Sequence, residues 1–491
     1  MAKTKLTPFV KQCIVTGAVG CNIICNIGFV FGLPGVLLPA LQQPHSEIPL
    51  TKVSASWIAS IISITTLLGN FVTPSIMERF GRRMAHICAS IPAVISWFVL
   101  AMATDVYMVL FARVLQGLSA GAILPLRSVL IGEYASPKYR GGFLTTVSLA
   151  QGFGIFLIHF IGSLLSWQRM SIVCGVIAFL SLVMAFYLPE SPSWLAVKGK
   201  YEECQKAFRW LRGDEEEKEL EELIESQIKL RKKKEREENG PQVNCIKKLG
   251  AVINRREFYM PLIVVSHCSV MIQACGNSTL PAFSVQIIRL MMGPTANAHA
   301  WMVALDSLRL CVNIAAVFII NKFKRRTILF STGGLCTLAH VAIASYMYAK
   351  SNNLLYYDAE WIPGLLIVLQ FFCIGLGMVP MPTVISGELI PLEFRSIISS
   401  IGVVFLSGVM FLVLQTFPLL VDSINLSGTY AIYAAVLIYL FIMLWFILPE
   451  TSGKTLQEIE NELRGDVTRI QDIEAAVSLK QEDESEKARS G

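Results

Sequence analysis

Three short charged phrases occur twice in this chain, in the same order and about 250 residues apart. Long apolar stretches separate the phrases in both copies. Each copy has a basic turn, then a Gly-Glu pair followed seven residues after its glutamate by an arginine, then a Leu-Pro-Glu turn: Glu78–Arg83 and Asn321–Arg326, Gly132–Arg140 and Gly387–Arg395, Leu188–Glu190 and Leu448–Glu450. A repeat of this kind predicts two halves that are built alike.

The apolar stretches are long enough to cross a lipid bilayer. Only 16% of the residues are charged and the mean hydropathy is +0.56, whereas a soluble protein carries roughly a quarter charged residues. A helix of about 20 apolar residues crosses the hydrocarbon layer. The strands of a membrane barrel would instead alternate apolar and polar residues, which these continuous apolar stretches do not. We expect an all-α membrane protein with twelve transmembrane helices in two pseudo-symmetric six-helix bundles: 12–40, 54–76, 84–104, 106–131, 142–166, 170–188, 258–288, 300–320, 327–349, 361–386, 397–421 and 428–448.

The distribution of basic residues predicts the orientation. The basic turns of both copies, with Arg140 and Arg395, fall on one side of the membrane, and few lysines or arginines fall on the other. The positive-inside rule makes that side cytoplasmic, together with both termini. The predicted organisation is a bundle over 1–189, a cytoplasmic linker over 190–257 with an amphipathic helix at 214–234, a bundle over 258–450 and a cytoplasmic tail over 451–491.

The repeated glutamates and arginines are candidates for a gate. They lie at the ends of spans, where charges pair when a mouth is shut and become hydrated when it opens. Setting the topology is the alternative role, but topology does not require glutamates at matched positions. The predicted network comprises Glu78, Arg82, Arg83, Glu133, Arg140, Glu190, Arg325, Arg326, Glu388, Arg395 and Glu450.

Polar residues inside the spans are candidates for a substrate site. Gln273, Asn277 and Ser278 cluster beside Gly276 and Pro281, which weaken a helix where transporters bind substrate. Arg127 has no acidic neighbour at helical spacing and needs a partner elsewhere, whereas Asp306 and Arg309 can neutralise each other one turn apart. Gln151 and Thr383 are weaker candidates, and hydrogen bonding between helices is the alternative role for all these groups. His159, His267 and His340 are isolated in spans and are interpreted as satisfied packing histidines, with a proton relay as the alternative.

These phrases resemble the sugar porter family of the major facilitator superfamily, over about residues 28–460. The matches are Arg79–Arg83, Arg113 with Gly117, Glu133 with Arg140-Gly141, Pro189–Leu195 and Pro449–Glu460, and the phrase Gly28–Gln42 is most similar to insect trehalose transporters. The resemblance implies a twelve-helix fold, alternating access and a cytoplasmic charge network that closes the inner gate.

The chain departs from that family where sugar is contacted. Ile272 stands at the first of two glutamines, Gln273 keeps the second, and Thr383 replaces a tryptophan. The span-one aspartate of proton-coupled members falls at Val30, which favours facilitated diffusion.

The sequence therefore predicts a monomeric plasma-membrane carrier of trehalose or a hexose. An organic anion carrier and a non-transporting sensor remain alternatives. Without metal-ligand spacing, a phosphate loop or a catalytic triad in the sequence, we expect no enzyme activity, cofactor, metal site or nucleic-acid partner.

Overall fold

The computed structural model describes residues 7–43, 46–213, 216–221, 223–225, 227–228, 255–320, 322–391, 394–450 and 459. The side chains of residues 137, 138, 140, 141, 144, 145 and 396 lie outside this description, as does the tail predicted over 451–491 apart from residue 459. The described residues are almost entirely helical and contain no strand.

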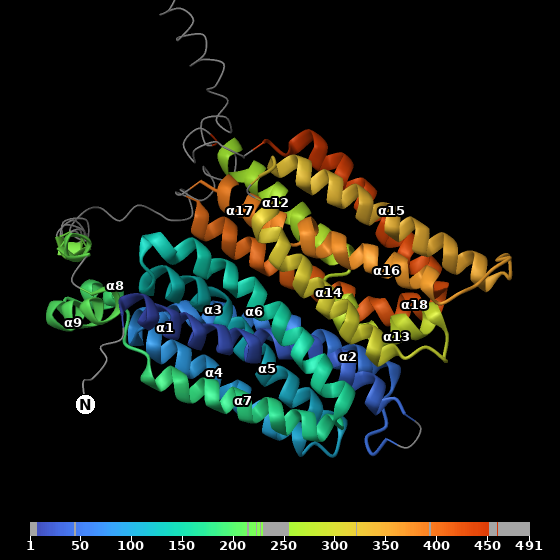
Figure 1. Cartoon of the computed structure of the whole chain (residues 1–491), viewed down its shortest axis with the longest axis horizontal. Coiled ribbons are helices and arrows are strands. Elements are labelled where there is room, and N and C mark those ends of the chain that lie inside the picture. Colours follow the sequence, from blue (N-terminus) through green and yellow to red (C-terminus); the bar gives the residue numbers. More distant parts are fainter. Residues whose placement is uncertain are drawn as a thin grey trace, which may run out of the picture.

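Eight helical elements make up the first half of the chain, which forms one side of the elongated bundle in Figure 1. Thr51 and Asp105 begin two of the long helices by accepting hydrogen bonds from the backbone N–H groups of Ser54 and Met108. The elements are α1 (Pro8–Ile23), a π-helix η1 (Ile24–Gly28), α2 (Phe29–Leu41), α3 (Lys52–Phe80), α4 (Arg82–Ala101), α5 (Val106–Tyr134), α6 (Pro137–Leu164) and α7 (Trp167–Tyr187).

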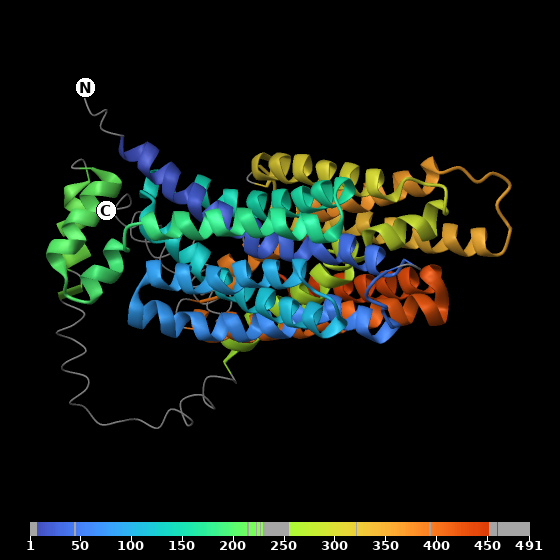
Figure 2. The same ribbon diagram turned by 90° about the horizontal axis from the view of Figure 1, so that it is seen from below.

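The second half forms the other side of the bundle (Figures 1 and 2). Its elements are α12 (Arg256–Ala274), α13 (Thr279–Met292), α14 (Ala298–Ile319), α15 (Arg325–Ser351), α16 (Trp361–Cys373), a π-helix η2 (Ile374–Met378), α17 (Pro380–Leu389) and α18 (Arg395–Ile447).

Eleven helices in the described residues are long and apolar enough to cross a membrane. The difference from twelve predicted spans has one cause, since α18 joins the spans predicted at 397–421 and 428–448. Asn425 divides α18 with φ 61° and ψ 174°, a conformation that an α-helix does not contain. Each of its two segments is long enough to span a bilayer, which needs about 20 residues.

Between the halves, the chain forms two short helices at one end of the bundle (Figures 1 and 2), α8 (Pro192–Val197) and α9 (Tyr201–Arg212). Residues 217–221, 223–225 and 227–228 are helical, as predicted for the linker, and the remainder of the predicted helix lies outside the described residues. Leu220 packs with Leu195 and Phe208 in a small apolar cluster. Arg212 donates a hydrogen bond to the Ala135 carbonyl, so α9 is held against the first half.

Close helix packing in the first half depends on small residues. A Cβ added at Gly121 in α5 would lie 2.0 Å from the Thr66 carbonyl oxygen in α3. Only glycine permits this approach, which is the usual way that membrane helices maximise contact without a hydrophobic driving force.

The two halves meet toward the end of the bundle opposite α8 and α9, which we call the far end. Lys52 at the start of α3 forms an ion pair with Asp422 at 2.8 Å, and Ser60 donates to Gln415 at 2.6 Å. His159 in α6 contacts Asp306 in α14 at 2.5 Å. We call the end that carries α8 and α9, where α3 ends and α4 begins, the network end.

Candidate functional site: matched charge clusters and a broken helix

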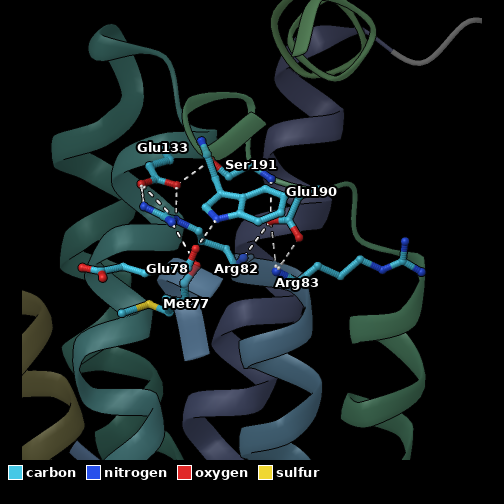
Figure 3. A network of polar contacts seen from close by, with 8 residues as sticks. Met77, Glu78, Arg82, Arg83, Glu133, Glu190 and Ser191 are labelled. Carbon is cyan, nitrogen blue, oxygen red and sulfur yellow. Dashed lines mark hydrogen bonds and ion pairs between the residues drawn. The ribbon is translucent and has the colours of Figure 1, made fainter. Parts of the chain in front are cut away.

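A cluster of charged residues joins four helices at the network end of the first half (Figure 3). Arg82 at the start of α4 binds the carboxylate of Glu133 near the end of α5 with two nitrogens, Nε at 2.9 Å and Nη2 at 2.8 Å. The Ser191 hydroxyl also donates to Glu133. This forked geometry is the strong form of an Arg–carboxylate pair, because two donors share one acceptor group.

Glu190 binds the backbone at the start of α4. Its carboxylate accepts hydrogen bonds from the N–H groups of Arg82 at 2.7 Å, Arg83 at 3.2 Å and Ser191 at 2.9 Å. A carboxylate at a helix N-terminus accepts from N–H groups that have no partner within the helix. Its negative charge also interacts favourably with the positive end of the helix dipole. The preceding residue is Gly81, with φ 97°. A Cβ at this position would lie 2.3 Å from Glu190 Oε2, so the missing side chain leaves room for the carboxylate.

The second half repeats the arrangement. Arg325 Nη2 contacts Glu388 at 3.3 Å, and the Glu450 carboxylate accepts from the N–H groups of Arg325 at 3.1 Å and Arg326 at 3.2 Å. In both copies the first arginine also donates to the carbonyl five residues before it, at Met77 or Ile320. The duplication in the sequence thus corresponds to a duplicated set of contacts.

The described pairs differ in detail from the predicted network. Glu133 and Glu388 bind Arg82 and Arg325, the basic turns of their own halves. The guanidinium groups of Arg83 and Arg326 donate to the carbonyls of Phe186 and Trp445, and that of Arg395 donates to the Gly387 carbonyl.

One member of the predicted network stands apart from these contacts, and the side chain of another lies outside the described residues. Glu78 contributes its backbone carbonyl to Trp194, while its carboxylate points away from Arg82 (Figure 3). Arg140 lies in α6, and its side chain is outside the described residues.

The span predicted at 258–288 is interrupted where the polar cluster lies. α12 ends at Ala274, α13 begins at Thr279, and Gly276 has φ 98° between them. Gln273 is buried, and its Oε1 has no hydrogen-bond partner in the part of the chain that the structure describes. Asn277 Oδ1 accepts a hydrogen bond of 2.8 Å from Arg309 of α14, and Ser278 is buried.

The other candidate substrate residues are not joined to this cluster by a hydrogen bond in the described residues. Arg127 lies in α5, and its buried Nη1 has no described partner. Thr383 donates to the Pro380 carbonyl within its own helix, and Gln151 is half-buried on α6.

The intramembrane charges make hydrogen-bond contacts that local spacing does not predict. Asp306 does not bind Arg309 directly: its carboxylate contacts His159, while Arg309 binds Asn277. His159 is a satisfied buried histidine, as expected, since both of its ring nitrogens have polar partners. One of these partners is the carboxylate of Asp306 in the second half of the chain. A chain separation of 147 residues lies between His159 and Asp306, so no local spacing could reveal their contact.

Arg113 is a further buried charge with a defined environment. It is fully buried in α5 and donates to the carbonyls of Ile58 and Val30 at 2.9 Å, and to Gln116 at 2.9 Å. Its contact with Val30 ties α5 to α2.

Similarity to known proteins agrees with the arrangement of these helices. The chain is 26% identical over 450 residues to a facilitated trehalose transporter Tret1 of Bombyx mori, covering 91% of this chain and 86% of the relative. It is also 26% identical to the Tret1 of Drosophila mojavensis, of whose length it spans only 51%.

Among solved structures, the fold matches the major facilitator superfamily proton:xylose symporter XylE bound to 6-bromo-6-deoxy-D-glucose. The TM-score is 0.68 at 19% identity, covering 93% of this chain and 99% of that one. The likeness shows that the fold is that of the major facilitator superfamily. Residues 11–463 match the family described as sugar (and other) transporter, and the chain therefore belongs to that family.

Proposed function

We propose that this protein carries a sugar, trehalose or a hexose, across the plasma membrane by facilitated diffusion. The buried Oε1 of Gln273 carries the proposal, because a buried acceptor without a partner is costly and a sugar hydroxyl would satisfy it. Asn277 and Ser278 lie just beyond Gln273, where α12 and α13 are separated. Neutral donors and acceptors suit a polyhydroxylated solute.

Alternating access requires two bodies that move against each other. We propose bundles over residues 1–189 and 258–450, joined by the linker 190–257 and followed by the tail 451–491, with the protein working as a monomer. The network end would face the cytoplasm together with both termini, because the basic turns lie there. Glu133, Arg140, Glu388 and Arg395, with the basic turns and Glu190 and Glu450, would control opening at this end.

The described pairs modify how that gate would work. Arg82 binds Glu133 within the first half, and Arg325 binds Glu388 within the second. Such pairs hold the helix ends of each half in place as it moves. Pairing between the halves would then belong to the state in which the network end is shut.

Tracer uptake into vesicles containing the purified protein tests the function. We expect saturable uptake of trehalose or a hexose that a proton gradient does not drive. Gln273→Ala should raise KM roughly tenfold, the effect of losing one hydrogen bond of about 1 kcal/mol or slightly more. Ser269→Ala is the control, since that hydroxyl donates to the Val265 carbonyl in its own helix.

Other outcomes would contradict the sugar proposal. Competition by small carboxylates that disappears in Arg127→Ala would identify an organic anion carrier, because Arg127 has a buried nitrogen without a described partner. Sugar binding without flux would identify a sensor. Equal uptake by Gln273→Ala and the unmodified protein would remove Gln273 from the site.

A further inference from the structure

A buried histidine and a buried aspartate connect the two halves near the far end. His159 of α6 is fully buried and Asp306 of α14 is 4% exposed. His159 Nδ1 lies 2.5 Å from Asp306 Oδ2, and Nε2 lies 2.8 Å from the Gly32 carbonyl oxygen of α2. Neither the charge clusters at the network end nor the proposed sugar site uses this pair.

The two contacts fix the number of protons on the pair. A carbonyl oxygen only accepts, so Nε2 must carry a hydrogen to bond with Gly32. Nδ1 can then bond with Asp306 in two ways: a protonated Nδ1 donates to the carboxylate, or a protonated carboxyl group donates to Nδ1. Either form holds one proton more than a carboxylate and a neutral imidazole would hold apart.

Other charged or titratable groups toward this end come from α13, α14 and the segment between α2 and α3. Arg309 follows Asp306 by one helical turn and is held by Asn277. Toward the far end, Arg289 of α13 and His299 of α14 line a cavity of about 390 Å³ together with Glu47. Gly35 of α2 packs closely against the pair, since an added Cβ would lie 2.9 Å from both His159 Nε2 and the Ser284 hydroxyl.

The cavity approaches the pair without reaching it, since neither His159 nor Asp306 lines it. Val36 and Gly162 also line it. They lie about one helical turn beyond Gly32 and His159, a rise of about 4.5–6 Å along each helix. Separation of the halves at this end would extend the cavity to His159 and Asp306, where a proton could leave.

We propose that His159 and Asp306 form a proton-binding site whose occupancy is linked to closure of the far end. The bound proton holds α6 and α14 together, and its release to the far-end solution accompanies their separation. Closing takes up one proton and opening returns one, so acidity favours the closed form. The inference rests on the proposed alternating access only in taking the far end to open.

The test measures the distance between the halves at the far end in the full-length protein without substrate. Spin-labelled amino acids at positions 53 and 423, both exposed, report on α3 and α18 by electron resonance. Between pH 5.5 and 8.5 we expect the open population to grow as pH rises. One linked proton changes the ratio of open to closed forms by up to about tenfold per pH unit.

Asp306→Asn keeps the hydrogen bond to His159 but removes the need for the extra proton. The amide N–H of the new side chain donates to Nδ1 while Nε2 donates to Gly32, so closure needs no added proton and should not vary with pH. His159→Gln removes the titratable ring and should also abolish the pH dependence. Asp422→Asn is the matched control: it alters an exposed carboxylate that also joins the halves, and it should keep the wild-type dependence.

Two results would overturn the proposal. One is a wild-type distance distribution that does not change over this pH range. The other is a wild-type pH dependence retained by either Asp306→Asn or His159→Gln. Because no substrate is present, failure of sugar uptake would contradict the proposed function and leave this measurement intact.

Discussion

The carboxylate of Glu190 lies 2.7 Å from the backbone nitrogen of Arg82. A residue that follows the sixth predicted span thus binds the N-terminus of the helix that forms the third. Glu450 holds the same relation to Arg325 at 3.1 Å. Each helix start is thereby tied to a segment more than a hundred residues away, since the two bonds span 108 and 125 residues.

Replacing Glu190 with glutamine tests the value of the negative charge. Gln keeps one oxygen that can accept from Arg82 but removes the charge at the start of α4. We expect the protein to lose about 1–2 kcal/mol of stability, measured by thermal unfolding in detergent. Glu78→Gln is the control, because that carboxylate points away from the cluster (Figure 3), and an equal loss in both variants would contradict this account.

Gly81→Ala should be harmful for two reasons. The residue has φ 97°, and a Cβ there would lie 2.3 Å from Glu190 Oε2. The backbone conformation alone, with ψ 172°, costs roughly 1–3 kcal/mol for a residue with a side chain. Gly132→Ala provides the comparison, since its Cβ would meet nothing within 4 Å. Equal thermal stability of the two variants would show that the close approach at Gly81 is not required.

Glu133→Gln and Glu388→Gln should slow transport more than they weaken binding. Each change leaves a partly buried arginine without its carboxylate, and hydrogen bonds to charged groups contribute about 1.5–3 kcal/mol. We expect turnover to fall roughly tenfold or more, with KM within about threefold, in vesicle uptake assays. Glu203→Gln, which alters an exposed pair with Lys200, is the control. Normal turnover in both variants would exclude these pairs from gating.

Cys204 reports on the packing of α9 against α8. Burial raises the pKa of its thiol to about 11. Little thiolate exists at neutral pH, so maleimide should label Cys204 at least about a hundredfold more slowly than a peptide cysteine. Mass spectrometry at Cys204 measures the rate, and Phe208→Ala, which loosens the same cluster, should increase it. Rapid labelling of the unmodified protein would show that α9 does not stay packed.

The sequence predicts most of the helices and the break near Gly276, because spans and helix breakers are local patterns. It also identifies Glu133, Glu190 and their counterparts as a network, because repetition marks them. It does not identify their partners. Glu133 binds Arg82 across 51 residues, and His159 binds Asp306 across 147, so both contacts depend on how whole helices pack. Local spacing instead favoured the neighbours Asp306 and Arg309.

The Arg–Glu clusters each lie inside one half, and this has a pharmacological consequence. A compound bound beside Arg82 and Glu133 would stiffen only the first half and would not block the proposed movement of that half against the other. A compound bound in the far-end cavity beside Arg289 and His299 would contact both halves, which are proposed to move against each other. We therefore expect conformation-trapping inhibitors to be found for the cavity sooner than for the charged clusters.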